Sequence, residues 1–246
     1  MTEPDQPASP YARRGFIAAG LVVALIVIAA VVVAVTGGND GSKATPRAGG
    51  ASTAAPSTSY TTSSSTTGCN QPAGSQLPPV TAPTNKWELV GSVAAPTAPT
   101  TSGPGKTAAG GLRTCFAHDP TGALFAAVNF LASTTDNTLL PLALGQLTSP
   151  GAGHDAALTA LSTNPSSVED DGQYRYQVSG FTFLAYTGDV ASVSLAIATA
   201  GGNGAVPITL DWSGTDWLVD LPADGNLAAL TQALPSLAGY VPWSGA

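Results

Sequence analysis

Two histidines are each followed by an aspartate, at His118-Asp119 and His154-Asp155, and these are the only such pairs in the chain. A hydrolase needs a nucleophile, a histidine base and an acid brought together in space. Serines are plentiful, but there is no G-x-S-x-G sequence of the kind on which many hydrolases mount their serine. Both aspartates also stand where helices are predicted to begin, and an aspartate there caps the helix. The sequence therefore predicts no catalytic residue and no enzyme.

Metal and cofactor sites are not predicted either. His118 and His154 do not stand at metal-ligand spacing with the acidic residues, and two cysteines with two histidines do not compose the usual structural zinc site. The acidic run at 169–171 lacks the ligand spacing of a calcium loop, so we interpret it as a solvated turn.

The two cysteines, Cys69 and Cys115, are expected to form a disulfide if this part of the chain lies outside the cytoplasm. Closing a loop of about 47 residues contributes about 4 kcal/mol in the chain-entropy model. The alternative is a pair of free, buried thiols.

Aromatic residues in the second half are candidates either for a binding pocket or for the core. Aromatic side chains on a sheet more often belong to the core, and two tryptophans on neighbouring strands form a cross-strand contact in the simplest interpretation. Asp211 and Asp216 are expected to point away from the tryptophan face and to be solvated. The candidate aromatics are Tyr174, Tyr176, Tyr186, Trp212 and Trp217.

Charge excludes one class of partner. The chain has 246 residues, with 8 Lys+Arg against 15 Asp+Glu and a net charge of -7. Nucleic-acid binding needs clustered basic residues on one surface, so we predict no nucleic-acid partner.

An uncharged apolar run, FIAAGLVVALIVIAAVVVAV, occupies residues 16–35. Twenty such residues in a helix span about 30 Å, the thickness of the hydrocarbon core of a bilayer. Arg13 and Arg14 directly precede the run and predict a cytoplasmic tail over residues 1–15, with everything after the run outside. The alternatives are a cleaved signal peptide, whose apolar region is shorter, and a buried core helix.

Composition then divides the rest of the chain. Residues 36–68 are dominated by Ser, Thr, Gly and Ala and contain no Leu, Ile, Val, Phe or Trp, which predicts a disordered linker. Residues 69–115 form a Pro/Gly-rich arm with one strand-like segment, and we expect the disulfide to staple this arm to the domain.

Residues 116–246 are predicted to form an extracytoplasmic α+β domain. Apolar residues recur at helical spacing over 116–165, with an interruption at Pro141, and alternate at strand spacing over 173–221. Gly180 stands where the alternation changes phase and indicates either a β-bulge or a bend of the sheet. A short apolar helix is expected in the tail, at LAALTQAL.

Two resemblances add to this interpretation. A helix with AAVNFL, a long bent strand and a closing hairpin with D-W and D-W resemble the NTF2-like cone, in which helices pack on a curved antiparallel sheet. The segment CFAHDPTGALFAAVNFLA resembles uncharacterised actinobacterial single-pass membrane proteins that are encoded among conjugation genes. Similar extracytoplasmic domains occur in TcpC-like subunits of type IV secretion machines.

The predicted protein is thus a single-pass protein of the cell membrane, with a cytoplasmic N-terminus and an extracytoplasmic C-terminal domain. Its expected function is that of a non-enzymatic scaffold or assembly protein, and the resemblance implies an accessory of an actinobacterial conjugative secretion apparatus. Its expected partners are the lipid bilayer, through residues 16–35, and other envelope proteins including secretion-system subunits, with oligomerisation left open. The first alternative function is small-molecule binding by an NTF2-like domain, and the second is that of an envelope hydrolase that uses His118 or His154.

Overall fold

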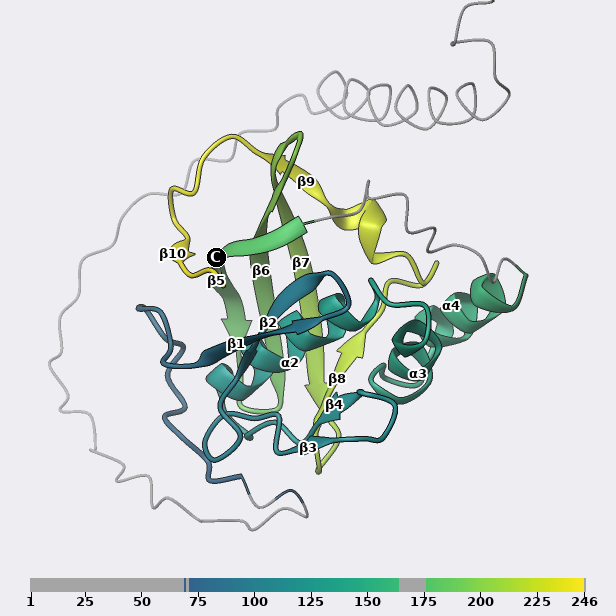
Figure 1. Cartoon of the computed structure of the whole chain (residues 1–246), viewed down its shortest axis with the longest axis horizontal. Coiled ribbons are helices and arrows are strands. Elements are labelled where there is room, and N and C mark those ends of the chain that lie inside the picture. The colour runs from purple at the N-terminus through teal and green to yellow at the C-terminus, as the bar shows by residue number, and fades with distance from the viewer. Residues whose placement is uncertain (1–68, 70, 164–175, 246) are drawn as a thin grey trace, which may run out of the picture. The chain divides into compact units, whose positions relative to one another are not determined.

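The computed structural model describes residues 69, 71–163 and 176–245 of the chain (Figure 1). The predicted cytoplasmic tail at 1–15, the apolar run at 16–35 and the predicted linker at 36–68 lie outside the described residues, as do the acidic run at 169–171 and Tyr174. Among the described residues, no helix combines the length and the apolar character that crossing a membrane requires.

An antiparallel sheet of six strands dominates the fold. Its strands follow the order β10-β5-β6-β7-β8, and β9 pairs with β7 beyond the end of β8. Alternate residues of β7 are buried, as the sequence pattern predicts, whereas β6 is buried on both faces over residues 193–197. The strands are β5 (Tyr176–Tyr186), β6 (Val190–Thr199), β7 (Gly202–Trp212), β8 (Trp217–Asp220), β9 (Gln232–Leu234) and β10 (Val241–Pro242).

The predicted β-bulge at Gly180 is confirmed. The register between β5 and β6 shifts between Val178 and Gly180, and it shifts again between Phe183 and Ala185. β10 also passes close to Gly180, because an added Cβ would lie 2.9 Å from the carbonyl oxygen of Val241. The glycine therefore serves both the bend of β5 and the close packing of β10.

Helix α2 (Pro120–Ser133) is the centre of the core. Every residue of α2 except Thr121 is buried, and a helix that is apolar all round is expected to be covered on all sides. The six-stranded sheet covers one side of the helix and the hairpin of β1 (Lys86–Val90) and β2 (Val93–Thr97) covers another (Figure 1). Two shorter helices, α3 (Leu139–Gln146) and α4 (Ala152–Thr163), pack together beside this layer.

Pro141 does not interrupt α3 as the sequence suggests, because it lies in the first turn of the helix. The backbone N–H groups of a first turn have no partner within the helix, so a proline there removes no hydrogen bond.

After α3 the chain runs beside β8, where Ser149 donates its backbone N–H to the carbonyl oxygen of Val219 at 2.9 Å.

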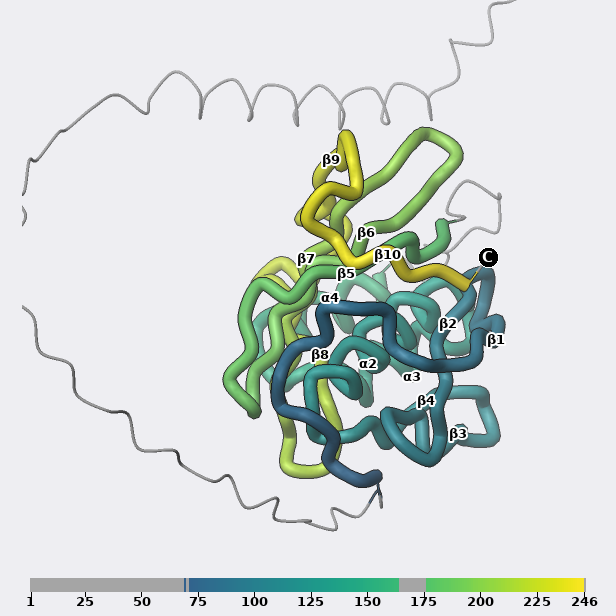
Figure 2. The backbone as a smooth tube through the Cα atoms, turned by 90° about the vertical axis from the view of Figure 1, so that its left-hand side faces the viewer, coloured from purple at the N-terminus to yellow at the C-terminus, as the bar shows by residue number. Residues whose placement is uncertain are grey.

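The arm at 69–115 is part of the core and not an appendage. It forms the β1–β2 hairpin and a second hairpin of β3 (Lys106–Thr107) and β4 (Arg113–Thr114). The side-chain amide of Gln177 joins β2 to β5, since it accepts from the backbone N–H of Ala94 at 3.0 Å and donates to the carbonyl oxygen of Ser92 at 3.1 Å. Figure 2 shows the arm and its hairpins running alongside the sheet and α2.

Trp243 closes the core from the C-terminal side. Only 5% of this residue is exposed, and its ring contacts those of Trp87, Phe125 and Phe181 at centroid distances of 4.7, 5.7 and 5.5 Å. Its indole N–H donates to the side-chain oxygen of Asn85 at 2.9 Å. The tail of the chain thereby holds the arm against α2.

The predicted fold class, an NTF2-like α+β cone after a transmembrane helix and a linker, is wrong for the residues that the structure describes, and the helix and linker lie outside them. The described residues are mostly sheet, with three α-helices and none that could cross a membrane. The main physical reason is the arm, whose hairpins add strands and enclose a single buried helix between two sheet layers. The tail adds one more strand, because only residues 227–230 of the expected tail helix are helical, as a 3-10 turn, and Gln232–Leu234 pairs with β7.

Candidate functional site

Polar and aromatic side chains gather at one end of the six-stranded sheet. The turn between β5 and β6, the turn between β7 and β8 and the first residues of α2 all meet there (Figure 1). The side chains that we call the end cluster come from these three segments and from the arm. Its members are Gln76, His118, Tyr186, Asp189, Trp212 and Trp217.

His118 lies at the centre of the contacts within the end cluster. Its ring stacks on Trp212 with a centroid distance of 4.2 Å and an interplanar angle of 9°. Its Nε2 lies 3.0 Å from Oδ1 of Asp189 and 3.1 Å from the carbonyl oxygen of Gly188. Because both neighbours are acceptors, Nε2 must carry the hydrogen and donate to them. The His118 side chain is 29% exposed and that of Asp189 is 78% exposed, so the pair lies at the surface.

The two tryptophans form the cross-strand pair that the sequence predicts. Trp212 and Trp217 are register partners in β7 and β8, with ring centroids 5.4 Å apart in an edge-to-face arrangement. Trp217 is buried, and its indole N–H donates to the carbonyl oxygen of Ala117 at 2.8 Å. Trp212 is only half-buried, which leaves part of its surface open beside His118.

Tyr186 ties the arm to the end cluster. Its hydroxyl donates to Oε1 of Gln76 at 2.6 Å, and Nε2 of Gln76 donates to the carbonyl oxygen of His118 at 2.9 Å. Burial raises the pKa of the Tyr186 phenol, and the negative charges of Asp119 and Asp189 raise it further. The end cluster therefore lies in a region of negative potential.

Asp119 organises the start of α2, as predicted for a capping residue. Its Oδ1 accepts the backbone N–H of Gly122 at 2.8 Å, and its Oδ2 accepts that of Gly74 in the arm at 2.7 Å. Burial raises the pKa of this carboxyl, against the opposing effect of those hydrogen bonds. Glycine is needed at position 122, because a Cβ would lie 2.0 Å from the carbonyl oxygen of Ala117.

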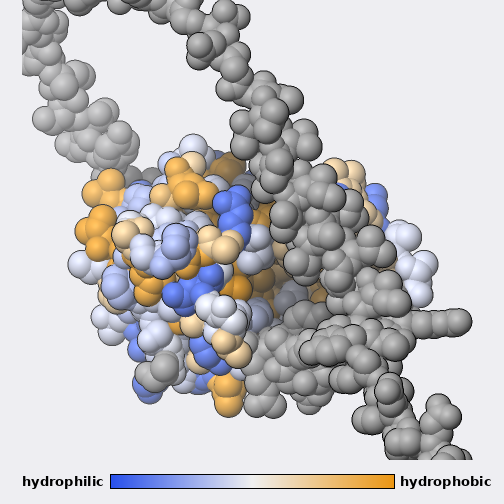
Figure 3. Space-filling model, turned by 90° about the horizontal axis from the view of Figure 1, so that it is seen from above, coloured by the Kyte–Doolittle hydropathy of each residue, from blue (hydrophilic) through white to orange (hydrophobic). Residues whose placement is uncertain are grey.

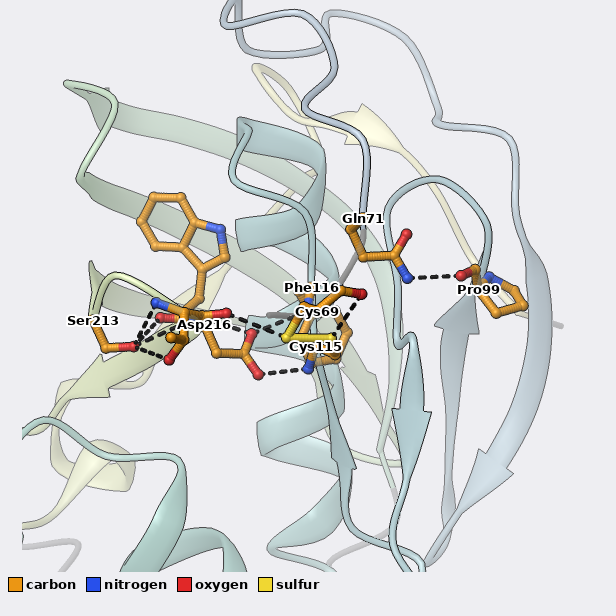
Figure 4. Close-up of a disulfide and its surroundings, with 9 residues drawn as sticks. Cys69, Gln71, Pro99, Cys115, Phe116, Ser213 and Asp216 are labelled. Carbon is orange, nitrogen blue, oxygen red and sulfur yellow. Dashed lines mark hydrogen bonds between the residues drawn. A yellow bond between two sulfur atoms is a disulfide. The ribbon is translucent and has the colours of Figure 1, made fainter. Parts of the chain in front are cut away.

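The disulfide between Cys69 and Cys115 lies beside Asp216, in the turn between β7 and β8 (Figure 4). Cys115 is fully buried and has a φ of 75°, a left-handed conformation that a residue with a Cβ rarely adopts. The carboxylate of Asp216 holds this conformation, since it accepts the backbone N–H groups of Cys115 at 2.5 Å and Phe116 at 3.0 Å. Asp216 is thus half-buried and hydrogen-bonded to the backbone, and not solvated as its place in the strand pattern suggests, and this burial raises the pKa of its carboxyl.

Gln71 completes the region around the disulfide. Its side chain is buried, and its Nε2 donates to the carbonyl oxygen of Pro99 at 2.7 Å (Figure 4). Its Oε1 is buried without a hydrogen-bond partner among the described residues. Gly105 leaves room for this side chain, because a Cβ there would lie 2.3 Å from Nε2 of Gln71.

The structure brings together only some of the predicted aromatics. Tyr186, Trp212 and Trp217 share the end cluster, but Tyr176 stands at the other end of β5, roughly 30 Å away along the strand. There the hydroxyl of Tyr176 donates to the carbonyl oxygen of Leu131 at 2.8 Å. Tyr174 lies outside the described residues.

Three members of the end cluster are not predicted as site residues from the sequence. The pattern around His118 indicates a helix start, and Gln76 and Asp189 belong to no recognisable motif. The position of Asp189 was predictable in principle. Alternate turns of an antiparallel meander lie at the same end of a sheet, so the turn between β5 and β6, which carries Asp189, lies beside Trp212 at the end of β7. Nothing in the sequence indicates that the start of α2 reaches that end.

Binding is the chemistry that this arrangement suits best. His118 pairs with Asp189, whereas His154 lies on α4 with its Nδ1 2.6 Å from the hydroxyl of Thr148. In the part of the chain that the structure describes, no group of three or more His, Cys, Asp or Glu side chains is placed to hold a metal ion. The end cluster instead combines an exposed carboxylate with half-buried aromatic rings, as recognition sites do.

Comparisons with known proteins give one match. A family model described as a domain of unknown function (DUF8175) matches residues 49–242. No curated protein and no solved structure matches the chain.

Proposed function

The chain belongs to the DUF8175 family, and we propose that it serves as a non-enzymatic assembly module of the cell envelope, held at the membrane with its folded domain outside the cytoplasm. The disulfide carries this proposal. Cys69 and Cys115 are joined within a fold that buries Cys115 completely and holds its backbone with Asp216. Such bonds persist in oxidising compartments and are rare in the cytosol.

Attachment to the membrane rests on the sequence of residues 16–35, which carries no charge and is long enough to reach across a bilayer. Arg13 and Arg14 favour a cytoplasmic N-terminus. The Ser/Thr/Gly/Ala-rich segment at 36–68 would then separate the lipid surface from Cys69. The proposed location and the disulfide thus support each other from independent observations.

The proposed partners are other envelope proteins. The resemblance of CFAHDPTGALFAAVNFLA to membrane proteins encoded among conjugation genes makes subunits of a conjugative type IV secretion apparatus the first partners to test. Nine acidic and three basic residues lie in the described part of the chain, so contact with DNA is not the expected role.

Topology is tested first. We expect a C-terminal β-lactamase fusion to confer resistance and a C-terminal green fluorescent fusion to stay dark. We also expect both cysteines of the native chain to resist alkylation until a reductant is added. Fluorescence in the cytosol together with freely alkylated cysteines would contradict the extracytoplasmic location.

The assembly role is tested separately. In a strain whose conjugation genes include this one, deleting the gene should lower transfer frequency, and the full-length chain should restore it. Cross-linking in intact cells should join the chain to a subunit of the secretion apparatus identified by mass spectrometry. Unchanged transfer after deletion would remove the conjugation role and leave the location untouched.

A second candidate function is the binding of a small molecule at the end cluster. The half-buried ring of Trp212 beside His118 favours it. This candidate predicts a ligand that quenches tryptophan fluorescence without any protein partner. A screen that yields no saturable quenching would leave assembly as the better account.

A further inference from the structure

We propose that Asp189 and the stacked rings of His118 and Trp212 bind an arginine side chain of a partner protein. This inference rests on the proposed assembly function, because the arginine belongs to the partner. It goes further by naming the surface and the chemistry of the contact.

The carboxylate of Asp189 is oriented but largely unused. In the described part of the chain, the structure records one hydrogen bond to this carboxylate, from Nε2 of His118, although 78% of the side chain is exposed. An ionised carboxylate accepts about four hydrogen bonds. His118 therefore fixes the position of the group and leaves most of its accepting capacity to solvent or to a partner.

The aromatic group beside Asp189 is a stack of two rings. His118 and Trp212 lie face to face, with centroids 4.2 Å apart and planes 9° apart, and both are only half-buried, so an outer face of the stack is what another planar group would contact. A guanidinium group is planar, stacks on aromatic faces and pairs with a carboxylate through two parallel N–H groups. A lysine ammonium has the charge but not the plane, so the surface favours arginine.

Charge points to the same occupant. The negative charges of Asp119 and Asp189 act on Tyr186 within the end cluster, and acidic residues outnumber basic ones by nine to three in the described chain. A cation is therefore attracted to this end of the sheet.

Apolar contact alone does not identify a docking face. The exposed large apolar residues are scattered over the arm, β1, β5, β6 and the 3-10 turn, and hydrophobic and hydrophilic residues mingle on the face drawn in Figure 3. The end cluster differs because a charge and two rings converge within a few ångströms.

The test uses the purified full-length chain in a non-ionic detergent and two peptides, acetyl-Gly-Arg-Gly-amide and acetyl-Gly-Lys-Gly-amide. We expect the arginine peptide to shift the indole N–H signal of Trp212 saturably and the lysine peptide to bind several-fold more weakly. Asp189→Asn should weaken arginine binding about tenfold, as expected for the loss of a charge-assisted pair. Asp220→Asn, at an exposed acid on β8, is the matched control and should leave binding unchanged.

Trp212→Leu should also weaken binding, and Asp189→Asn keeps the test decisive if the leucine variant fails to fold. Equal binding of both peptides, or equal binding by wild type and Asp189→Asn, would overturn the proposal. If the arginine peptide binds only after Arg47→Gln, the occupant is the arginine of this chain's own residues 36–68, and the assignment to a partner is wrong. None of these outcomes bears on the topology experiments, so the two proposals fail separately.

Discussion

The carboxylate of Asp216 accepts the backbone N–H of Cys115 at 2.5 Å, across a sequence separation of 101 residues. The turn between β7 and β8 therefore fixes the conformation of a cysteine that belongs to the arm. The same carboxylate accepts from Phe116 and from Trp217, so one side chain satisfies three backbone donors.

Replacing Asp216 by alanine should destabilise the domain by about 3 kcal/mol, because buried N–H groups lose their acceptor. Denaturant unfolding of the oxidised protein measures the change, with Asp220→Asn as the exposed acidic control on the adjoining strand. A loss below about 0.5 kcal/mol, the range of ordinary surface substitutions, would show that the left-handed Cys115 does not depend on this carboxylate.

Removing the disulfide should cost about 4 kcal/mol in the chain-entropy model for a sequence separation of 46 residues. We expect the paired variant Cys69→Ser with Cys115→Ser to unfold at a lower denaturant concentration than the oxidised wild type. Reduced wild type serves as the control for the effect of the serines. Equal midpoints for all three proteins would mean that the arm is held by packing alone.

Trp243→Ala should destabilise the domain by about 4 kcal/mol, the usual range for truncating a large buried aromatic. The ring contacts Trp87, Phe125 and Phe181, and its loss leaves a cavity between the arm and α2. Limited proteolysis should then cleave the arm first. Trp243→Phe retains most of the packing but loses the bond to Asn85, and it should be the milder variant. Similar losses for both variants would assign the effect to that hydrogen bond.

The buried carboxyls give stability an unusual dependence on pH. Burial raises the pKa of Asp119 and Asp216 above the ordinary value of 3.8. The folded state then keeps protons that the unfolded chain has already released, so these two groups lower the free energy of unfolding as pH rises from 3.8 through their folded pKa values. When chemical unfolding is measured across this pH range, the free energy of unfolding should fall less steeply with pH in Asp216→Asn than in wild type. An identical slope would mean that Asp216 titrates normally.

Two phenols should resist alkaline titration. Burial raises the pKa of Tyr176 and of Tyr186 above the ordinary value of 10. Absorbance at the phenolate band should therefore rise in two stages, the second only as the protein unfolds. Above the ordinary phenol pKa the unfolded chain loses protons that the folded state keeps, so stability falls as pH increases. Tyr176→Phe should shrink the late stage, and an unchanged late stage would contradict the burial of this phenol.

The sheet was largely predictable because its strands alternate. Val206, Ile208 and Leu210 face the core at every second position of β7, and Gly180 marks the bulge in β5. Burial on one face fixes such strands from local sequence alone. The capping role of Asp119 was predictable for the same reason, since a cap depends on residues within one turn.

The arm and much of the site were not predictable, because they depend on contacts between distant residues. β1 is mostly exposed, and its position depends on the contact between Trp87 and Trp243, which forms only when the chain folds. The Trp212–Trp217 pair follows from the hairpin pattern, but the stack of His118 on Trp212 depends on where α2 begins relative to the sheet. No local periodicity encodes that distance.

The bond between Asn85 and Trp243 spans 158 residues, and it has a consequence for biogenesis. Until residue 243 has been synthesised, the indole of Trp243 cannot contact the arm, and one apolar side of α2 stays uncovered. Native closure must therefore follow synthesis of residue 243, and shorter nascent chains should remain sensitive to protease. The apolar surfaces that Trp243 covers in the native fold therefore stay exposed until the last aromatic residue of the chain has been made.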